Sequence, residues 1–256
     1  MESEIRATLE EATRLCDEEC DEDAEVLVLD ALSKFPDHAD LLTILGKIQS
    51  RLHKEQHAET TLKAVLAKNP NHEDASCALG RLLDQSLRTE EAETLYRGLL
   101  ERRPDSHCAL DDLCRLLIGE GRHLEALDVA RNHVDRYPGS LEAYDGLRYL
   151  LAVLEDEICG GYVSDSTDNE TLEKLVVNLI EQFDVIMRIE KNIGPLSGLA
   201  EPIASDMQEE YLRIVGELEH LYGVIDARGL NLPLSLSAQL AAAIKEGTDR
   251  RNTLLA

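Results

Sequence analysis

Hydrophobic positions recur at helical spacing along most of the chain. In one early stretch, Leu41, Leu45, Ile48 and Leu52 follow one another at intervals of four, three and four residues. This spacing places them on one face of an α-helix. The same stretch does not fit a phosphate-binding loop around Lys47, because Leu41 stands where that loop needs its first glycine and Ile48 where it needs a hydroxyl residue. The segment therefore predicts an amphipathic helix with one buried face.

The pattern repeats at a constant interval. The tripeptide LGK at 45–47 is followed by LGR at 79–81 and LCR at 113–115, each 34 residues further along the chain. Two further residue types keep the same interval, namely Pro36, Pro70, Pro104 and Pro138, and Ala24, Ala58, Ala92 and Ala126. Proline cannot continue a helix, so it marks the end of each unit. Each unit is expected to hold two helices, with small residues such as Gly46 and Gly80 where those helices approach closely.

With its Leu-Gly, alanine and proline markers at these offsets, the sequence resembles the tetratricopeptide repeat family, whose unit is a helix–turn–helix of about 34 residues. The units expected are 5–38, 39–72, 73–106 and 107–140, followed by a fifth first helix at 140–157. The first unit has Glu11-Ala12 instead of Leu-Gly, and the fourth has Cys114 instead of the glycine. The resemblance implies an all-α fold, a right-handed α-solenoid of such repeats, over residues 1–157.

Residues 158–256 are expected to form more helix rather than further regular units. The helices are expected near 171–191, 206–228 and 235–252. Asp206 is a suitable N-cap for the second of them and Gly229 a suitable stop. A solenoid needs its last apolar face covered, so we expect a C-terminal helical cap. A separate interaction module is the alternative.

In the resembled family, one face of each first helix lines a concave groove that binds peptides. Lys47 lies ~200° around its helix from Leu45 and therefore points away from the buried stripe. Arg81 and Arg115 hold the same position in the next two units, so the three cations are expected to form a row. The groove residues expected are Thr43, Lys47, Arg51, Cys77, Arg81, Asp111, Arg115 and Tyr149.

Two interpretations of this cationic row remain. It could pair with carboxylates of a bound partner segment. It could equally be a solvated helix face with local ion pairs. The acidic residues suited to such pairs are Asp74, Asp84 and Asp111.

The net charge is −25, from 26 basic and 51 acidic residues. Nucleic acid and anionic membranes repel such a field, so neither is expected as a partner, whereas basic protein surfaces are favoured. The six cysteines form no Cys-x-x-Cys pair, and the chain shows no apolar signal core or membrane-length apolar run. A reducing cytoplasm fits this cysteine usage.

Candidate chemistry is sparse. His53 and His57 are four residues apart, but the repeat phase places His53 in a turn between helices and the Glu of a zinc-peptidase motif is missing. Cys16 and Cys20 are interpreted as packing thiols. We therefore expect no catalytic residue, no metal and no cofactor. The function expected is a non-enzymatic adaptor or scaffold for a partner protein or peptide. The alternative is a cytoplasmic holding chaperone, and the C-terminal helices offer a further surface for self-association.

Overall fold

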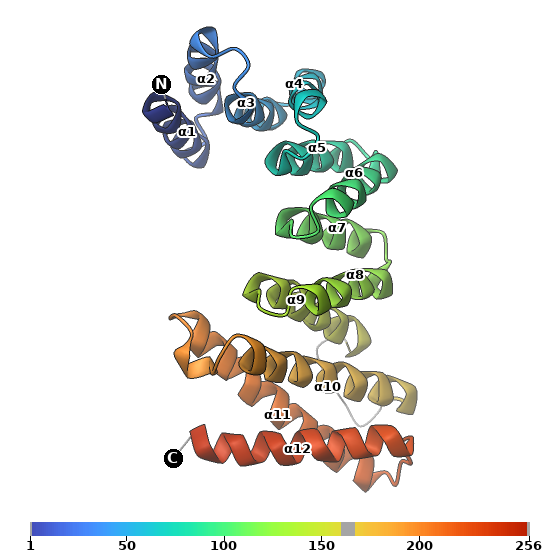
Figure 1. Cartoon of the computed structure of the whole chain (residues 1–256). Coiled ribbons are helices and arrows are strands. Elements are labelled where there is room, and N and C mark those ends of the chain that lie inside the picture. The colour runs from blue at the N-terminus through green and yellow to red at the C-terminus, as the bar shows by residue number, and fades with distance from the viewer. Residues whose placement is uncertain (1, 160–166, 255–256) are drawn as a thin grey trace. The chain divides into compact units, whose positions relative to one another are not determined.

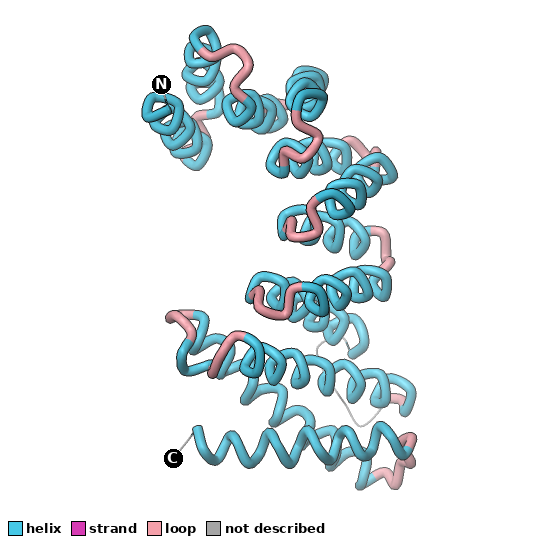
Figure 2. The backbone as a smooth tube through the Cα atoms, viewed as in Figure 1, coloured by secondary structure: helices cyan, strands magenta, loops and turns pink. Residues whose placement is uncertain are grey.

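The computed structural model describes residues 2–159 and 167–254, and these ranges contain helices, turns and loops but no strand (Figures 1 and 2). The all-α prediction is confirmed. The elements are α1 (Glu2–Asp17), α2 (Asp21–Lys34), α3 (Ala39–Arg51), α4 (Glu55–Lys68), α5 (Glu73–Gln85), α6 (Thr89–Arg102), α7 (His107–Gly119), α8 (His123–Arg136), α9 (Leu141–Cys159), α10 (Asn169–Asn192), the 3₁₀ turn η1 (Leu196–Gly198), α11 (Ile203–Ala227) and α12 (Leu234–Leu254).

The helices belong to two compact units, Met1–Arg122 and His123–Ala256. The first unit holds α1–α7 and the second holds α8–α12. The boundary that the sequence predicts, after residue 157, differs from this division and stays a prediction.

The first unit is built from helix pairs at the predicted interval. The first helices α1, α3 and α5 each pack on the second helix that follows, and α1, α3, α5 and α7 contact one another in order. The repeat alanines of the second helices, Ala24, Ala58 and Ala92, are fully buried. The glycines mark the closest approaches as expected, because a Cβ at Gly46 would lie 2.6 Å from Leu62 Cγ and one at Gly80 would lie 2.4 Å from Tyr96 Cε1.

A left-handed residue ends each first helix of this unit. Glu19, His53, Leu87 and Gly121 have φ values of 60°, 55°, 58° and 72°, and their positions keep the repeat interval. The amide of the following residue then donates to a carbonyl five residues back, as in Lys54 N to Gln49 O at 2.8 Å. This bond satisfies one of the carbonyls that a helix end leaves unpaired. His53 therefore lies in a turn, as its repeat phase indicates.

Ion pairs also follow the repeat. Lys54 Nζ lies 2.5 Å from Glu25 Oε2, Arg88 Nη1 lies 2.9 Å from Glu59 Oε2, and Arg122 Nη1 lies 2.7 Å from Glu93 Oε2. Each cation follows the left-handed residue of one unit, and each glutamate belongs to the second helix of the unit before. We call these three pairs the inter-repeat ladder. It joins successive units through side chains that share the repeat period.

In the second unit α8 packs on α9 and α9 packs on α10, while α10, α11 and α12 contact one another pairwise. The start of α11 differs from the expected N-cap at Asp206. The helix begins at Ile203, with Pro202 at the capping position, so Asp206 lies in its first turn. An acidic side chain there stabilises the positive end of the helix dipole without capping it.

Gly229 ends α11 as predicted. It has φ +60°, and Leu230 N donates to Ile225 O at 3.0 Å. This is the Schellman arrangement, which glycine favours because it lacks a Cβ.

Candidate functional site

The face formed by the first helices α3, α5 and α7 carries most of the predicted groove residues, and they divide into buried and exposed positions. Thr43 and Cys77 are both buried, and the Thr43 hydroxyl donates to Ala39 O at 2.8 Å. Asp111, at the same repeat position, is exposed. Thr43 and Cys77 thus support the helix packing beneath this face, and the surface that solvent reaches is formed by their neighbours.

Lys47 and Arg51, both on α3, have different surroundings. Lys47 Nζ lies 4.0 Å from Asp74 Oδ2, with both side chains largely exposed, so this pair is weak. Arg51 is held in two places, because its Nε donates to Asp21 Oδ1 at 2.6 Å and its Nη2 donates to Cys16 O at 2.7 Å. Arg51 therefore links α3 to the end of α1 and the start of α2, while the Lys47 ammonium group is only weakly paired.

Arg81 and Arg115 meet at one buried carboxylate. Arg81 Nε lies 3.0 and 2.8 Å from the two oxygens of Asp112, and Arg115 Nη2 donates to Asp112 Oδ1 at 2.5 Å. The Asp112 side chain is 1 % exposed, whereas those of Arg81 and Arg115 are 46 % and 63 % exposed. A buried carboxylate needs such partners, because an unpaired charge away from water is strongly unfavourable. Two guanidinium groups share one carboxylate, so Arg81, Arg115 and Asp112, the arginine cluster, together carry one net positive charge, and Asp84 also lines the adjoining cavity.

A small cavity of about 90 Å³ adjoins the arginine cluster. Its lining consists of Arg81, Asp84, Gln85, Tyr96, Asp112, Arg115 and Leu116. The volume suits one polar side-chain head. Guanidinium groups bind carboxylates through paired N–H donors, and both arginines have donors beyond those that Asp112 receives. The cavity is therefore a place where an acidic side chain of a partner could pair.

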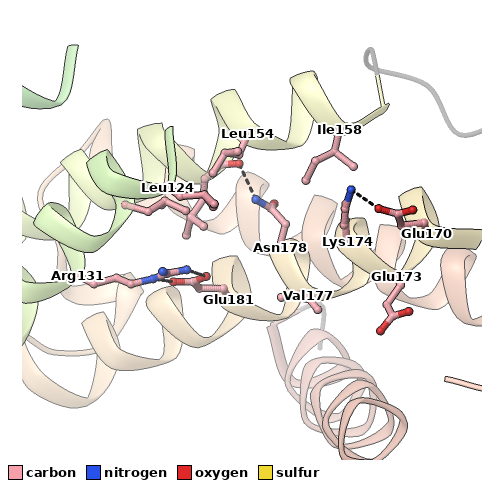
Figure 3. Close-up of a pocket in the computed structure, with 12 residues that line it drawn as sticks. Leu124, Arg131, Leu154, Ile158, Glu170, Glu173, Lys174, Val177, Asn178 and Glu181 are labelled. Atoms are coloured by element: carbon pink, nitrogen blue, oxygen red, sulfur yellow. Dashed lines mark hydrogen bonds and ion pairs between the residues drawn. The ribbon is translucent and has the colours of Figure 1, made fainter. Parts of the chain in front are cut away.

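Tyr149, the predicted groove residue of the second unit, lies on α9 and is 63 % exposed. A larger cavity, which the sequence patterns did not indicate, lies in that unit among α8, α9 and α10 (Figure 3). The cavity measures about 540 Å³. Its apolar lining consists of Leu124, Leu127, Leu151, Leu154, Ile158 and Val177.

Charged pairs lie at the two ends of this larger cavity in the view of Figure 3. Arg131 donates from Nε and Nη2 to the two Glu181 oxygens, at 2.6 Å each, and Lys174 Nζ lies 2.8 Å from Glu170 Oε1. Two of its apolar lining residues are exposed, Leu124 at 74 % and Val177 at 48 %. Scattered exposed apolar residues are common on protein surfaces, so they did not identify the cavity in advance.

Comparison with known proteins agrees with the repeat geometry. A family model described as tetratricopeptide repeat matches residues 53–114. The helix pairs, their constant interval and the exposed first-helix face define a helical-repeat protein of the kind that binds other proteins. Residues 53–114 therefore consist of tetratricopeptide repeats, and the helix pairs before and after them keep the same interval. No curated protein matches the chain.

Several solved structures have similar folds. A thermophilic tetratricopeptide repeat protein of Thermus thermophilus shares 14% identity at a TM-score of 0.49, over 73% of this chain and 97% of that one. A tetratricopeptide repeat protein of Parabacteroides merdae shares 17% identity at a TM-score of 0.45, over 96% of this chain and 99% of that one. MamA of Desulfovibrio magneticus RS-1 shares 18% identity at a TM-score of 0.44, over 70% of this chain and 97% of that one. These scores lie below 0.5, so the family match and the helix pairs carry the assignment.

None of the helices within residues 2–159 and 167–254 combines the length and apolarity needed to cross a membrane.

Proposed function

We propose that this protein is a non-enzymatic scaffold that binds a protein or peptide partner on the first-helix face of its N-terminal unit. The arginine cluster is the centre of the proposed site, and Lys47 on the neighbouring first helix extends it. An acidic side chain of the partner pairs with Arg81 and Arg115 at the small cavity beside Asp112.

The observation that carries this proposal is the sharing of one buried carboxylate by two half-exposed guanidinium groups. Arg81 and Arg115 each have N–H donors beyond those that Asp112 accepts, so the cluster can receive a second carboxylate. Long-range attraction would bring a partner with a basic surface to the protein, and the arginine cluster would then fix the position of one acidic group. A partner carrying both signs fits this arrangement best.

A peptide-binding titration tests the proposal. The probe is a fluorescein-labelled decapeptide of alternating Glu and Leu, and anisotropy reports binding. We expect Arg81→Gln and Arg115→Gln each to weaken binding about tenfold, since a hydrogen bond to a charged group contributes about 1.5–3 kcal/mol.

The matched control is Lys63→Gln. Lys63 is an exposed cation on the second helix α4, paired with Glu59 at 2.5 Å, and its removal also changes the net charge by one. Equal affinity for wild type and for both arginine variants, or equal losses in the control, would contradict the proposed site.

We also propose a cytoplasmic location, which suits the reduced thiols of Cys16, Cys20, Cys77 and Cys108. The roles predicted for α10–α12, as a cap of the repeat array or as a surface for self-association, stay predictions.

A further inference from the structure

Two thiols from successive first helices meet under the proposed binding face. Cys77 belongs to α5, and Cys108 lies in the first turn of α7. Their Sγ atoms and a carboxylate oxygen of Asp112 all lie within 4.8 Å of one another. Cys77 is 1 % exposed, while Cys108 is partly exposed. The pair thus has one thiol that small solutes can reach and one that only its neighbour can reach.

The surroundings favour the thiolate form of Cys108. Arg81 Nη2 lies 3.3 Å from Cys108 Sγ, and an adjacent guanidinium stabilises a negatively charged sulfur. The hydrogen bond with the Cys77 thiol lowers the pKa of Cys108, against the opposing effects of burial and of the Asp112 and Glu73 carboxylates. Asp112 Oδ2 lies 3.8 Å from Cys108 Sγ. The hydrogen bond between the two thiols, together with burial, raises the pKa of Cys77. One sulfur is therefore suited to attack, while the other keeps its proton.

We propose that Cys77 and Cys108 form a redox-active dithiol, in which Cys108 is the peroxide-reactive thiolate and Cys77 the resolving thiol. The Cys108 thiolate attacks the terminal oxygen of a hydroperoxide, forming an S–O bond as the O–O bond breaks. The hydroxide or alkoxide that leaves takes a proton from solvent. The Cys77 sulfur then attacks the Cys108 sulfenic acid, an S–S bond forms, and the oxygen leaves as water with the Cys77 proton. The two sulfurs lose two electrons, which the peroxide gains.

The disulfide would change the arginine cluster. An S–S bond of ~2.05 Å requires the two sulfurs to approach, and a Cys108 sulfur in a disulfide no longer carries the negative charge that Arg81 stabilises. A covalent link between α5 and α7 forms, and one guanidinium donor of Arg81 becomes available beside the small cavity. This consequence for partner binding rests on the proposed function, whereas the disulfide itself does not.

A metal ion is the competing occupant, because two sulfurs and a carboxylate resemble part of a zinc site. Asp112, however, already accepts from two guanidinium groups. The positive charge of Arg81 would also repel a divalent cation. The charges therefore favour thiol oxidation over metal binding.

The experiment uses the reduced full-length protein, hydrogen peroxide, thiol alkylation and peptide mass spectrometry. We expect a disulfide between the peptides containing Cys77 and Cys108, and loss of the free Cys108 thiol at least tenfold faster than that of Cys114. Burial raises the pKa of Cys114 to about 12, so it serves as the internal slow control. In Cys77→Ala, dimedone should trap a sulfenic acid at Cys108. In Cys108→Ala, Cys77 should stay reduced.

Two results would overturn the proposal. One is oxidation of Cys108 no faster than that of Cys114, with helicity unchanged by circular dichroism. The other is stoichiometric Zn²⁺ binding that Cys108→Ala abolishes, with no disulfide formed by peroxide. Titration of the Glu–Leu peptide into reduced and oxidised protein tests the link to the binding face. A mapped disulfide without peptide binding would contradict the proposed function and leave the dithiol standing.

Discussion

The ring of Tyr96 lies directly over the backbone of Gly80, so that a Cβ at residue 80 would stand 2.4 Å from Cε1 and 2.6 Å from the hydroxyl oxygen. Tyr96 is buried to 1 % exposure, and neighbouring side chains fix the ring. Glycine is required at position 80 because a side chain there would overlap the Tyr96 ring. The backbone conformation does not require it, because residue 80 lies within the ordinary α-helix α5.

Gly80→Ala is expected to lower the free energy of unfolding by about 1–3 kcal/mol, the usual range for forcing an extra carbon into a packed interior. Urea denaturation followed by circular dichroism measures it. Gly98→Ala on α6 is the matched control. A Cβ there would meet only the flexible end of Arg102, at 3.2 Å, so the better helix propensity of alanine should leave stability unchanged or raise it by up to ~1 kcal/mol.

Leu87→Gly is expected to stabilise the protein by about 0.5–1 kcal/mol. Leu87 holds a left-handed conformation at φ 58° and is 89 % exposed, so glycine relieves the contact between Cβ and carbonyl and loses little packing. Leu87→Ala, which keeps the Cβ, should change little. The reciprocal change Gly121→Ala, at the equivalent turn with φ 72°, should destabilise by about 1 kcal/mol. The midpoints of thermal unfolding of the three variants and of wild type measure these differences. An unchanged or lower midpoint for Leu87→Gly would contradict the strain argument.

Glu93→Gln should reveal the pH dependence of the inter-repeat ladder. The guanidinium groups of Arg122 and Arg97 lower the pKa of Glu93 from 4.5 to about 2. A group with a depressed folded pKa stabilises fully above its unfolded pKa and loses that contribution as the pH falls through its folded pKa. The difference in unfolding free energy between wild type and Glu93→Gln should therefore be greatest at pH 7 and shrink between about pH 5 and pH 2.

Urea titrations at pH 7, 4 and 3 measure this difference. Glu101→Gln, an exposed position on the same helix, controls for the change in net charge. A difference for Glu93→Gln that stayed constant over this range would mean that its carboxylate titrates alike in the folded and unfolded chains.

Asp112→Asn should separate the contribution of the arginine cluster to stability from its contribution to peptide binding. The amide keeps the shape but loses the negative charge that Arg81 and Arg115 share, so stability should fall by about 1–3 kcal/mol. The same change raises the net charge of the cluster from +1 to +2, and affinity for the Glu–Leu peptide should rise. Anisotropy titration at low and high salt measures the second effect. A folded Asp112→Asn protein that binds the acidic peptide more weakly than wild type would place the carboxylate itself in the contact.

The repeat markers predicted the helix pairs well because leucine, alanine and proline act locally or within one pair. The features that sequence reasoning missed depend on how one repeat is set against the next. Asp112 and Arg81 are 31 residues apart, and their meeting follows from the packing of α7 on α5. Local ion pairs were one interpretation of the cationic row. Lys47 pairs with Asp74, one of the partners expected, whereas Arg81 and Arg115 pair with Asp112 rather than with Asp84 or Asp111.

The buried polar side chains of α10 also depend on packing against another helix, which the sequence does not reveal. Asn178 Nδ2 donates to Leu151 O at 3.0 Å, and Gln182 Nε2 donates to Asn178 Oδ1 at 2.7 Å. The sequence shows this helix as apolar on more than one face, but it does not show what these two amides bind. Both are buried, because α9 supplies the partner that makes their burial tolerable.

The inter-repeat ladder makes the repeats of the N-terminal half interchangeable. Removing residues 54–87 would place Arg88 directly after the left-handed residue of the second repeat, in the position of Lys54 and within reach of Glu25. Gly46 would then face Tyr96 as Gly80 does now. The ladder pair and the glycine contact at the junction would each find a partner of the same kind, whereas the contacts of Glu73 with Ser106 and Arg103 would be lost, because Ala39 would take its place. The number of repeats can therefore change by whole units while the ladder pair at each join is kept.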